Sequence, residues 1–221
     1  MSETGKSHSI FNGIRVRIGF LIVGTLAIIV LYCLAWAYPT FPGDEATLIR
    51  LQSFRSEWLD AMAVIFDNLG SLWTVLPSVV VLTVFLFLTR RYADVGLFMG
   101  GLVFVGMGKV LKLLVERPRP DYQIIEPFAS GFSFPSGHSL FAVILGGVLV
   151  YWVDQWVGPK LPRRVIQILL VLVVIGMGAS RVYLGVHWPS DVIGSYLLGI
   201  LALTGLFWLR EAWPVIRNSL G

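Results

Sequence analysis

Long apolar runs alternate with short polar segments along most of this chain. A helix needs about 20 mostly apolar residues to cross the hydrocarbon core of a bilayer, and several runs approach or exceed that length. The pattern predicts transmembrane helices at residues 14–38, 71–88, 93–115, 136–156, 165–183 and 190–208. We therefore expect an all-α, polytopic membrane protein built as a bundle of about six spans.

The segment 41–69 has a different, amphipathic pattern. Charged residues such as Asp44 and Arg55 are interleaved with apolar residues such as Leu48 and Leu51. This pattern favours a helix that lies in the membrane interface over one that spans the bilayer. We expect an interfacial amphipathic helix after the first span, which either shapes a lateral opening for a lipid or covers the edge of the bundle.

The chain has no internal repeat and no low-complexity linker, so we expect one domain. The domain covers residues 14–210, between a polar, irregular amino-terminal tail at 1–13 and a carboxy-terminal tail at 211–221. The first apolar run has the position of a signal peptide. However, its length of about twenty residues favours an uncleaved signal anchor.

Composition agrees with a membrane protein, because 56% of the residues are hydrophobic and 14% are charged, against about 25% charged in soluble domains. The net charge of +4 does not indicate a nucleic-acid partner, since the basic residues fall mostly between apolar runs.

A cytoplasmic amino terminus satisfies the positive-inside rule. It places in the cytoplasm Lys6, Arg15, Arg17, Arg90, Arg91, Lys160, Arg163, Arg164, Arg210 and Arg217. We expect a multi-pass protein of the cytoplasmic (inner) membrane.

Some basic residues fall on the opposite, outer face in this orientation. They are Lys109, Lys112, Arg117, Arg119 and Arg181. Polar groups at the ends of membrane spans are costly and therefore indicate function. The segments 112–120, 134–139 and 180–191 belong to neighbouring helix ends in an up-and-down bundle, and together they suit an anion bound at the outer face.

The stretch 180–191 contains the most suggestive pair of side chains. His187 and Asp191 lie four residues apart, and Pro189 favours the start of a helix between them. The carboxylate then lies beneath the imidazole and holds its Nδ1 proton, which leaves Nε2 as a base, a nucleophile or a metal ligand. The alternative is a buried pair that only caps a transmembrane helix.

The chain resembles the type 2 phosphatidic acid phosphatase superfamily of membrane lipid phosphatases. The resemblance covers roughly the carboxy-terminal half, where the segments 112–120, 135–138 and 180–191 match the three signature motifs of that superfamily. The matching positions, without a departure, are Lys112, Arg119, Pro120, Pro135, Ser136, Gly137, His138, Ser180, Arg181, His187 and Asp191.

The resemblance implies a role for each of these residues. His187 would be the nucleophile that forms a phosphohistidine, with Asp191 fixing its tautomer, and His138 would be the general acid and later the base for water. The phosphate oxygens would be bound by Lys112, Arg119, Arg181, Ser136 and the amide of Gly137. Ser180 would contribute a phosphate contact or an indirect hydrogen bond. The residues Lys109, Glu116 and Arg117 are left outside the predicted site.

We expect no metal and no other cofactor. Two histidines and one aspartate already used for orientation are poor ligands for a divalent ion. Cys33 is the single cysteine, which excludes thiolate clusters and disulfides within the chain.

The predicted function is hydrolysis of a lipid phosphate or diphosphate at the outer face of the membrane. Candidate substrates by resemblance are undecaprenyl diphosphate, phosphatidylglycerol phosphate, phosphatidic acid and lipid A phosphate. The same residues would serve a lipid phosphotransferase or a phosphatase for small soluble phosphates. A permease that binds an anion without turnover is the non-enzyme alternative. Substrate selectivity is expected from segments 41–69 and 121–134, and no motif specifies an oligomeric state.

Overall fold

The computed structural model describes residues 3–124 and 129–220, with side chains from residue 15 to residue 212 in those ranges. These residues form helices without any strand. The helices are α1 (Glu3–Ala37), α2 (Asp44–Gln52), α3 (Glu57–Leu69), α4 (Leu72–Leu88), α5 (Tyr92–Val115), α6 (Gly137–Trp156), α7 (Lys160–Tyr183) and α8 (Pro189–Leu220). The prediction of an all-α membrane protein is confirmed.

Five helices are long and apolar enough to cross a membrane by themselves: α1, α5, α6, α7 and α8. The span predicted at residues 71–88 is α4, which reaches that length only together with α3, and the two helices meet at a bend of 47°. The predicted interfacial helix is thus two helices, α2 and α3. Of these, α3 leads directly into α4.

The predicted tails are helical where the structure describes them. Residues 3–13, expected to be irregular, are the first turns of α1, and residues 211–220 continue α8. The fifth span also begins earlier than expected, at Lys160, because the basic segment 160–164 forms the first turn of α7. Residues 125–128 of the predicted selectivity loop lie outside the described residues.

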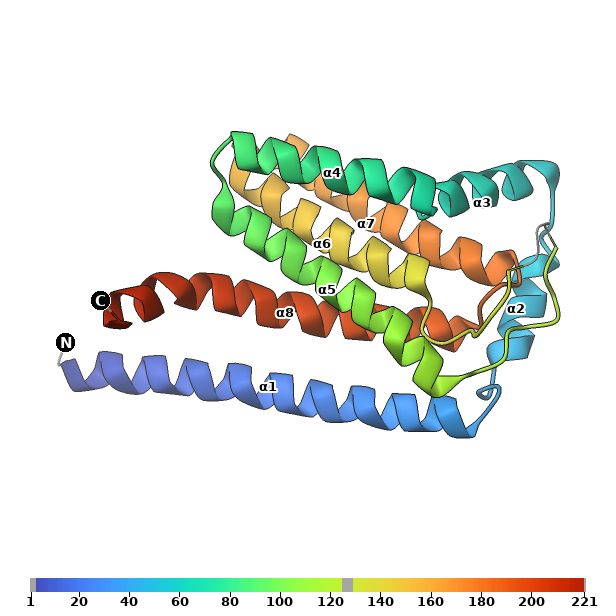
Figure 1. Cartoon of the computed structure of the whole chain (residues 1–221), viewed down its shortest axis with the longest axis horizontal. Helices are drawn as coiled ribbons and strands as arrows, with labels where there is room; N and C mark the ends of the chain where they lie inside the picture. The colour runs from blue at the N-terminus through green and yellow to red at the C-terminus, as the bar shows by residue number, and fades with distance from the viewer. Residues whose placement is uncertain (1–2, 125–128, 221) are drawn as a thin grey trace.

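The helix α6 lies in the middle of the bundle and packs against α5, α7 and α8 (Figure 1). One of its faces carries Leu140, Ile144 and Val148, which are fully buried against residues such as Phe98 of α5 and Leu198 of α8. Lipid tails are as apolar as these side chains, so close packing and not water exclusion holds the helices together. Glycines on α6 and its neighbours permit the close approach.

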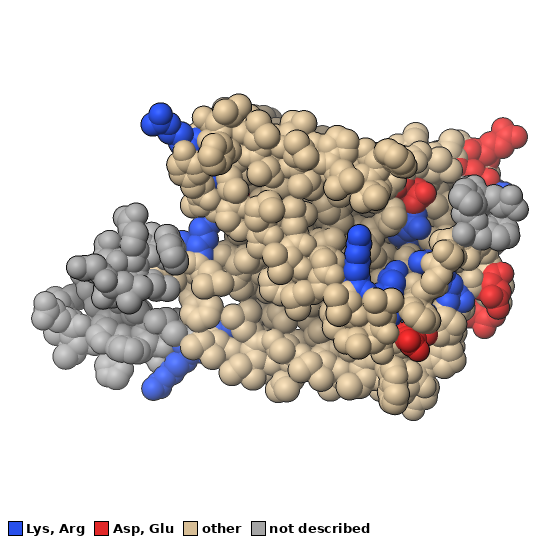
Figure 2. Space-filling view, viewed as in Figure 1, with Lys and Arg blue, Asp and Glu red and all other residues tan. Residues whose placement is uncertain are grey.

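The two chain ends lie at the same end of the bundle (Figure 1). At the opposite end, the carboxy termini of α5 and α7 meet the amino termini of α6 and α8, beside α2. The three motif segments therefore converge, as the up-and-down topology predicts. Figure 2 shows a mostly uncharged band between charged side chains at the two ends, with basic groups visible at both ends and acidic groups at the end opposite the termini.

Candidate active site

The loop before His187 is shaped by the way α7 ends. Gly185 has a left-handed backbone with φ of 71°, its amide donates to the carbonyl of Val182 at 2.9 Å, and the amide of Val186 donates to the carbonyl of Arg181 at 3.1 Å. These are the two hydrogen bonds of a Schellman motif, in which glycine avoids the steric cost of a Cβ. The turn stops α7 and leads the chain directly to His187.

The next helix places Asp191 under His187. The helix α8 begins at Pro189, and Asp191 in its first turn accepts a hydrogen bond from the amide of Trp188 at 2.9 Å. The same carboxylate oxygen, Oδ2, lies 3.4 Å from Nδ1 of His187 and accepts from the hydroxyl of Ser133. Both His187 and Asp191 are buried. The predicted pairing is therefore present, with His187 just ahead of the helix and not on it.

A buried arginine holds the other oxygen of Asp191. Nη1 of Arg117 donates to Oδ1 of Asp191 at 2.6 Å, and Nη2 donates to Oδ2 of Asp44 at 2.8 Å. The guanidinium also donates to the carbonyl of Pro39 and lies over the ring of Phe41. Arg117 and Asp44 were not assigned to the site from the sequence. The available signal in the sequence was that these two residues carry opposite charges and both lie near the ends of spans. Nothing in the sequence indicates that they pair with each other.

The surroundings of His187 keep its imidazole neutral. Burial lowers the pKa of His187 well below its usual range, and the positive charges of Lys112, Arg119 and Arg181 lower it further. Nη1 of Arg119 lies 3.4 Å from Nε2 of His187. With Nδ1 facing Asp191, Nε2 is the nitrogen left for chemistry, and a cation stands beside it.

The guanidinium of Arg119 is anchored by backbone carbonyls. It donates to the carbonyl of Val186 at 2.5 Å and to those of Ser130 and Gly131. Lys112, in the last turn of α5, is half-buried and makes no ion pair with a described residue. Two cations predicted to bind phosphate thus lie near His187, one fixed by the loop and one free to pair with an anion.

The amino terminus of α6 supplies the second motif. Ser136 is the fully buried N-cap, and its hydroxyl oxygen accepts from the amide and the hydroxyl of Ser139. Gly137 is exposed at the first helical position and His138 follows, so the free backbone amides of the first turn are available to an anion. Ser136 therefore holds the helix end in place through its side chain.

Three predicted residues have partners that the sequence did not indicate. Nε2 of His138 lies 3.5 Å from Oδ1 of Asp67, and Arg181 forms an ion pair with the same oxygen. The hydroxyl of Ser180 donates to the carbonyl of Met177 at 2.8 Å within α7 and is buried there. Asp67 comes from α3, whose sequence predicted only a helix at the membrane surface.

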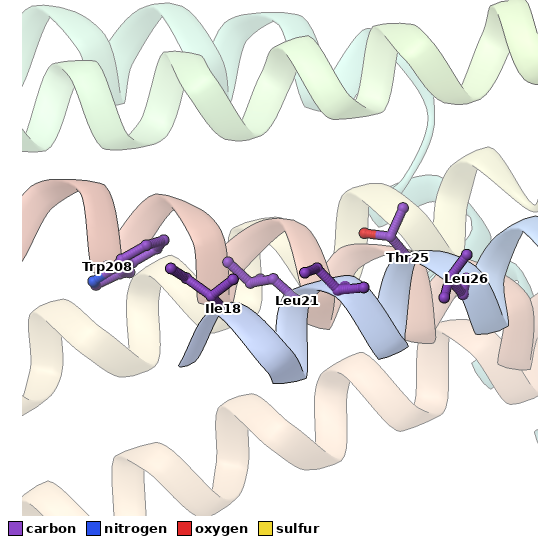
Figure 3. A pocket seen from close by; sticks show the side chains of 6 residues that line it. Ile18, Leu21, Thr25, Leu26 and Trp208 are labelled. Atoms are coloured by element: carbon purple, nitrogen blue, oxygen red, sulfur yellow. The ribbon is translucent and has the colours of Figure 1, made fainter. Parts of the chain in front are cut away.

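The described residues contain no group of three or more His, Cys, Asp or Glu side chains placed to hold a metal ion. Their charges instead suit a phosphate, with cations and helix amides around a neutral imidazole. An apolar hollow of about 310 Å³ between α1 and α8 lies elsewhere (Figure 3). It is lined by Ile18, Leu21, Ile22, Thr25, Leu26 and Trp208 and offers no comparable chemistry.

Comparison with known families decides the assignment. A sequence model of the PAP2 superfamily matches residues 91–214, which is more than half of the chain and includes all three motifs. The chain belongs to the PAP2 superfamily. The resemblance inferred from the motifs is thereby confirmed. Asp44 and Asp67 lie outside the matched residues.

The relatives of this PAP2 protein are phosphatases. It is 35% identical to phosphatidylglycerophosphatase B of Bacillus subtilis over 72% of this chain and 78% of that protein. It is 27% identical to an undecaprenyl-diphosphatase of Sulfolobus acidocaldarius over 71% of this chain and 74% of the other. Among solved structures, the B. subtilis transmembrane PAP2 type phosphatidylglycerolphosphate phosphatase matches with a TM-score of 0.70 and 28% identity, covering 84% of this chain and 95% of that one.

Proposed function

We propose that this PAP2 protein is a lipid phosphatase that hydrolyses a lipid phosphate or diphosphate through a phosphohistidine on His187. The observation that carries the proposal is the state of that side chain. His187 is buried, burial and nearby cations lower its pKa, its Nδ1 faces Asp191, and its Nε2 faces the cation of Arg119. The phosphatases among its relatives support the same reaction.

Binding comes first in the proposed mechanism. The ammonium of Lys112 and the guanidinium groups of Arg119 and Arg181 neutralise the phosphate oxygens, and the amides at the start of α6 add hydrogen-bond donors. These groups are held by α5, α6, α7 and the loop after α5 before any substrate arrives. They therefore stabilise charge on the phosphoryl group without reorganising during the reaction.

Transfer to His187 follows. Nε2 attacks phosphorus, the bond to the leaving oxygen breaks, and protonated His138 gives its proton to that oxygen. Asp191 stabilises the positive charge that develops on the imidazole. A water molecule then attacks the phosphohistidine while neutral His138 takes a proton from it, the P–N bond breaks, and inorganic phosphate leaves.

Two side chains receive narrower roles than the family resemblance implies. The hydroxyl of Ser180 is used within α7, so we assign it to holding the last turn before Arg181. The hydroxyl of Ser136 caps α6, so we assign it to aiming the amide of Gly137 and its neighbours at the phosphate.

The proposed substrates carry their phosphate at the end of an apolar chain. The site lies at helix ends, level with α2, where a lipid headgroup would sit. An apolar groove of about 360 Å³ runs between α3 and α7, lined by residues such as Met62, Phe66 and Tyr183, and it reaches Ser180 beside the cation of Arg181. We place the site at the outer face of the cytoplasmic membrane, with undecaprenyl diphosphate, phosphatidylglycerol phosphate, phosphatidic acid and lipid A phosphate as candidates.

Phosphate release from these lipids by the purified protein in detergent tests the proposal. We expect release that persists in excess chelator and is lost in His187→Ala. Rapid quenching should trap a phosphorylated protein whose label is lost in acid and kept in alkali, as expected for a phosphohistidine. A folded protein that releases no phosphate from any candidate, or that needs an added divalent ion, would contradict it.

Product analysis separates the alternative acceptors. In the presence of a lipid alcohol, hydrolysis yields inorganic phosphate, whereas a phosphotransferase yields a new lipid phosphate. Release of inorganic phosphate from small soluble phosphates but not from lipids would favour a phosphatase for small soluble substrates. Transporters usually bind their substrates near the bilayer midplane, and the position of this site at helix ends therefore argues against a permease.

A further inference from the structure

Asp67 is a carboxylate at the site that no motif contains. Its Oδ1 atom lies 3.5 Å from Nε2 of His138 and is also the atom that pairs with Nη1 of Arg181. The side chain is 39% exposed, whereas that of His138 is 28% and that of Arg181 is 7% exposed. It reaches the site from α3, outside the residues that match the family. Asp67 thus touches both the proposed acid and a proposed phosphate ligand.

The break between α3 and α4 brings Asp67 to this position. The amide of Gly70 donates to the carbonyl of Asp67 at 3.0 Å, and the chain then turns by 47° into α4. A Cβ on Gly70 would collide with the ring of His138 and lie 3.1 Å from Cε of Met177. The backbone at Gly70 therefore lies in contact with the imidazole of His138. The turn at this residue fixes the position of Asp67, three residues earlier.

The two histidines of the site are built in parallel. Nδ1 of His187 lies 3.4 Å from a carboxylate oxygen of Asp191, and Nε2 of His138 lies 3.5 Å from one of Asp67. Each carboxylate also pairs with an arginine, Arg117 for Asp191 and Arg181 for Asp67. Catalytic contacts are often long before substrate binds and tighten in the complex. The arrangement of Asp67 is thus that of a carboxylate which orients an imidazole.

The charges around His138 explain why such a carboxylate is needed. Lys112 from α5 and Arg119 from the following loop lie near enough to His138 for their charges to act on it, and Arg181 from α7 shares Asp67 with it. These three basic side chains place positive charge around the ring, which a nearby carboxylate offsets. Among the described residues, Asp67 is the acidic side chain in ion-pair range of the ring.

We propose that Asp67 is a positioning residue for the acid step, an inference that rests on the proposed function. Its carboxylate accepts Nε2–H of His138 and leaves Nδ1 as the nitrogen that exchanges the proton. Protonated His138 then gives its Nδ1 proton to the leaving oxygen as the P–O bond breaks and the bond from Nε2 of His187 to phosphorus forms. Neutral His138 later recovers a proton at Nδ1 from the attacking water, and Asp67 keeps its charge throughout.

The test compares Asp67→Asn with the unaltered full chain in detergent micelles, using two substrates. A lipid phosphate has a poor alkoxide leaving group that needs the acid, whereas nitrophenyl phosphate has a good one. We expect kcat for the lipid to fall on the order of 10- to 100-fold, which is within the contribution of general acid catalysis. KM should stay level or fall, since a negative charge near the phosphate is removed. Nitrophenyl phosphate should lose much less.

Three further variants control this test. Asp60→Asn changes a carboxylate on the same helix that bonds to Tyr183 and Arg55, and it should leave the ratio between the two substrates unchanged. Asp67→Glu should recover part of the lost kcat. In a His138→Ala background, Asp67→Asn should add little further loss, because the two residues act in one step.

Several outcomes would overturn the inference. If Asp67→Asn keeps its kcat and lowers KM, the carboxylate only competes with phosphate for Arg181. Equal losses for both leaving groups, or full additivity with His138→Ala, would remove Asp67 from the acid step. An active parent with an unchanged Asp67→Asn variant overturns this inference alone, whereas an inactive parent overturns the proposed function as well.

Discussion

The side chain of Asp191 is held by partners that are themselves buried. Asp191 contacts His187 on one oxygen and Arg117 on the other, and it is fully buried. The carboxylate thus has two tasks, because it orients a proposed nucleophile and neutralises a buried cation. At Asp191, an effect on catalysis can be distinguished from an effect on stability only when the substitution keeps the shape of the side chain.

Asp191→Asn keeps the shape but loses the charge and the capacity to hold the proton on Nδ1 of His187. We expect kcat to fall between about 100- and 10,000-fold, with little change in KM, as for other orienting aspartates beside a catalytic histidine. Steady-state kinetics with a lipid phosphate measure this, and thermal unfolding in detergent reports the parallel loss of stability. A rise in KM without a loss of kcat would contradict the orienting role.

Arg117→Met should destabilise the fold more than it changes substrate binding. The variant leaves Asp44 and Asp191 buried without their cation, and removing one partner of a buried ion pair costs about 3–5 kcal/mol. Equilibrium unfolding in mixed micelles measures the loss. Arg50→Ala, at an exposed arginine of α2, is the matched control and should cost below about 1 kcal/mol. Equal stability of the two variants would remove Arg117 from the structural core of the site.

The lowered pKa of His187 predicts where activity is lost in acid. The neutral, nucleophilic form persists below the usual pKa of 6.5, so the acid limb of kcat/KM should lie below pH 6.5. Lys112→Met removes one of the cations that lower this pKa and should move the limb to higher pH. Folding stability should decrease as pH falls below 6.5, because the unfolded chain then binds a proton that folded His187 does not.

The acid limb of the kcat/KM profile must be distinguished from titration of the substrate's own phosphate group. The phosphorus NMR shift of the lipid phosphate in the same micelles gives the substrate's own pKa, and the limb assigned to His187 is the one that moves in Lys112→Met. An acid limb above pH 6.5 that coincides with no substrate titration would show that His187 is not held neutral.

At the scale of helices and turns, the end of α7 is expected to be sensitive to substitution. Gly185 has a positive φ, and a Cβ there would collide with the backbone carbonyl of Tyr122. We expect Gly185→Ala to cost at least about 1–3 kcal/mol and to lower kcat by moving His187. Thermal unfolding and phosphate release measure the two effects.

Two other glycines serve as controls for Gly185→Ala. Gly131 also has a positive φ but has open space around it, so Gly131→Ala reports backbone strain without a collision. Gly106 is helical with open space, so Gly106→Ala should be neutral or slightly stabilising. If Gly185→Ala were no worse than Gly131→Ala, the contact with Tyr122 would not matter for the turn.

Across the whole molecule, the topology connects charge distribution to the position of the site. Both chain ends lie at one end of the bundle and the motif residues lie at the other. From the positive-inside rule we expect the chain ends in the cytoplasm and the site at the outer face. A lipid headgroup in the outer leaflet would meet the cations of the site without crossing the bilayer.

Cysteine labelling in intact cells tests this orientation. In a Cys33→Ser background, a cysteine replacing exposed Arg50 on α2 should react with a membrane-impermeant reagent added outside. A cysteine replacing Gly158, between α6 and α7, should react only after the membrane is permeabilised. The reverse pattern would place the site in the cytoplasm.

Five of the spans, the family motifs and the convergence of three segments followed from the sequence alone. Hydropathy over about 20 residues is a local property, and an up-and-down bundle leaves few choices for which helix ends meet. The pairing of His187 with Asp191 was equally accessible, because four residues along a chain with a proline between them restrict the geometry.

The partners of those residues depended on the folded chain. Arg117 and Asp44 lie 73 residues apart, and nothing local selects one acidic residue of the amphipathic segment over another. The same holds for Asp67, which meets His138 only because α3 breaks at Gly70, and for Ser180, whose hydroxyl bonds within α7. Helix rotation and long-range approach are set by packing of the whole bundle, and a single sequence records no such pairing.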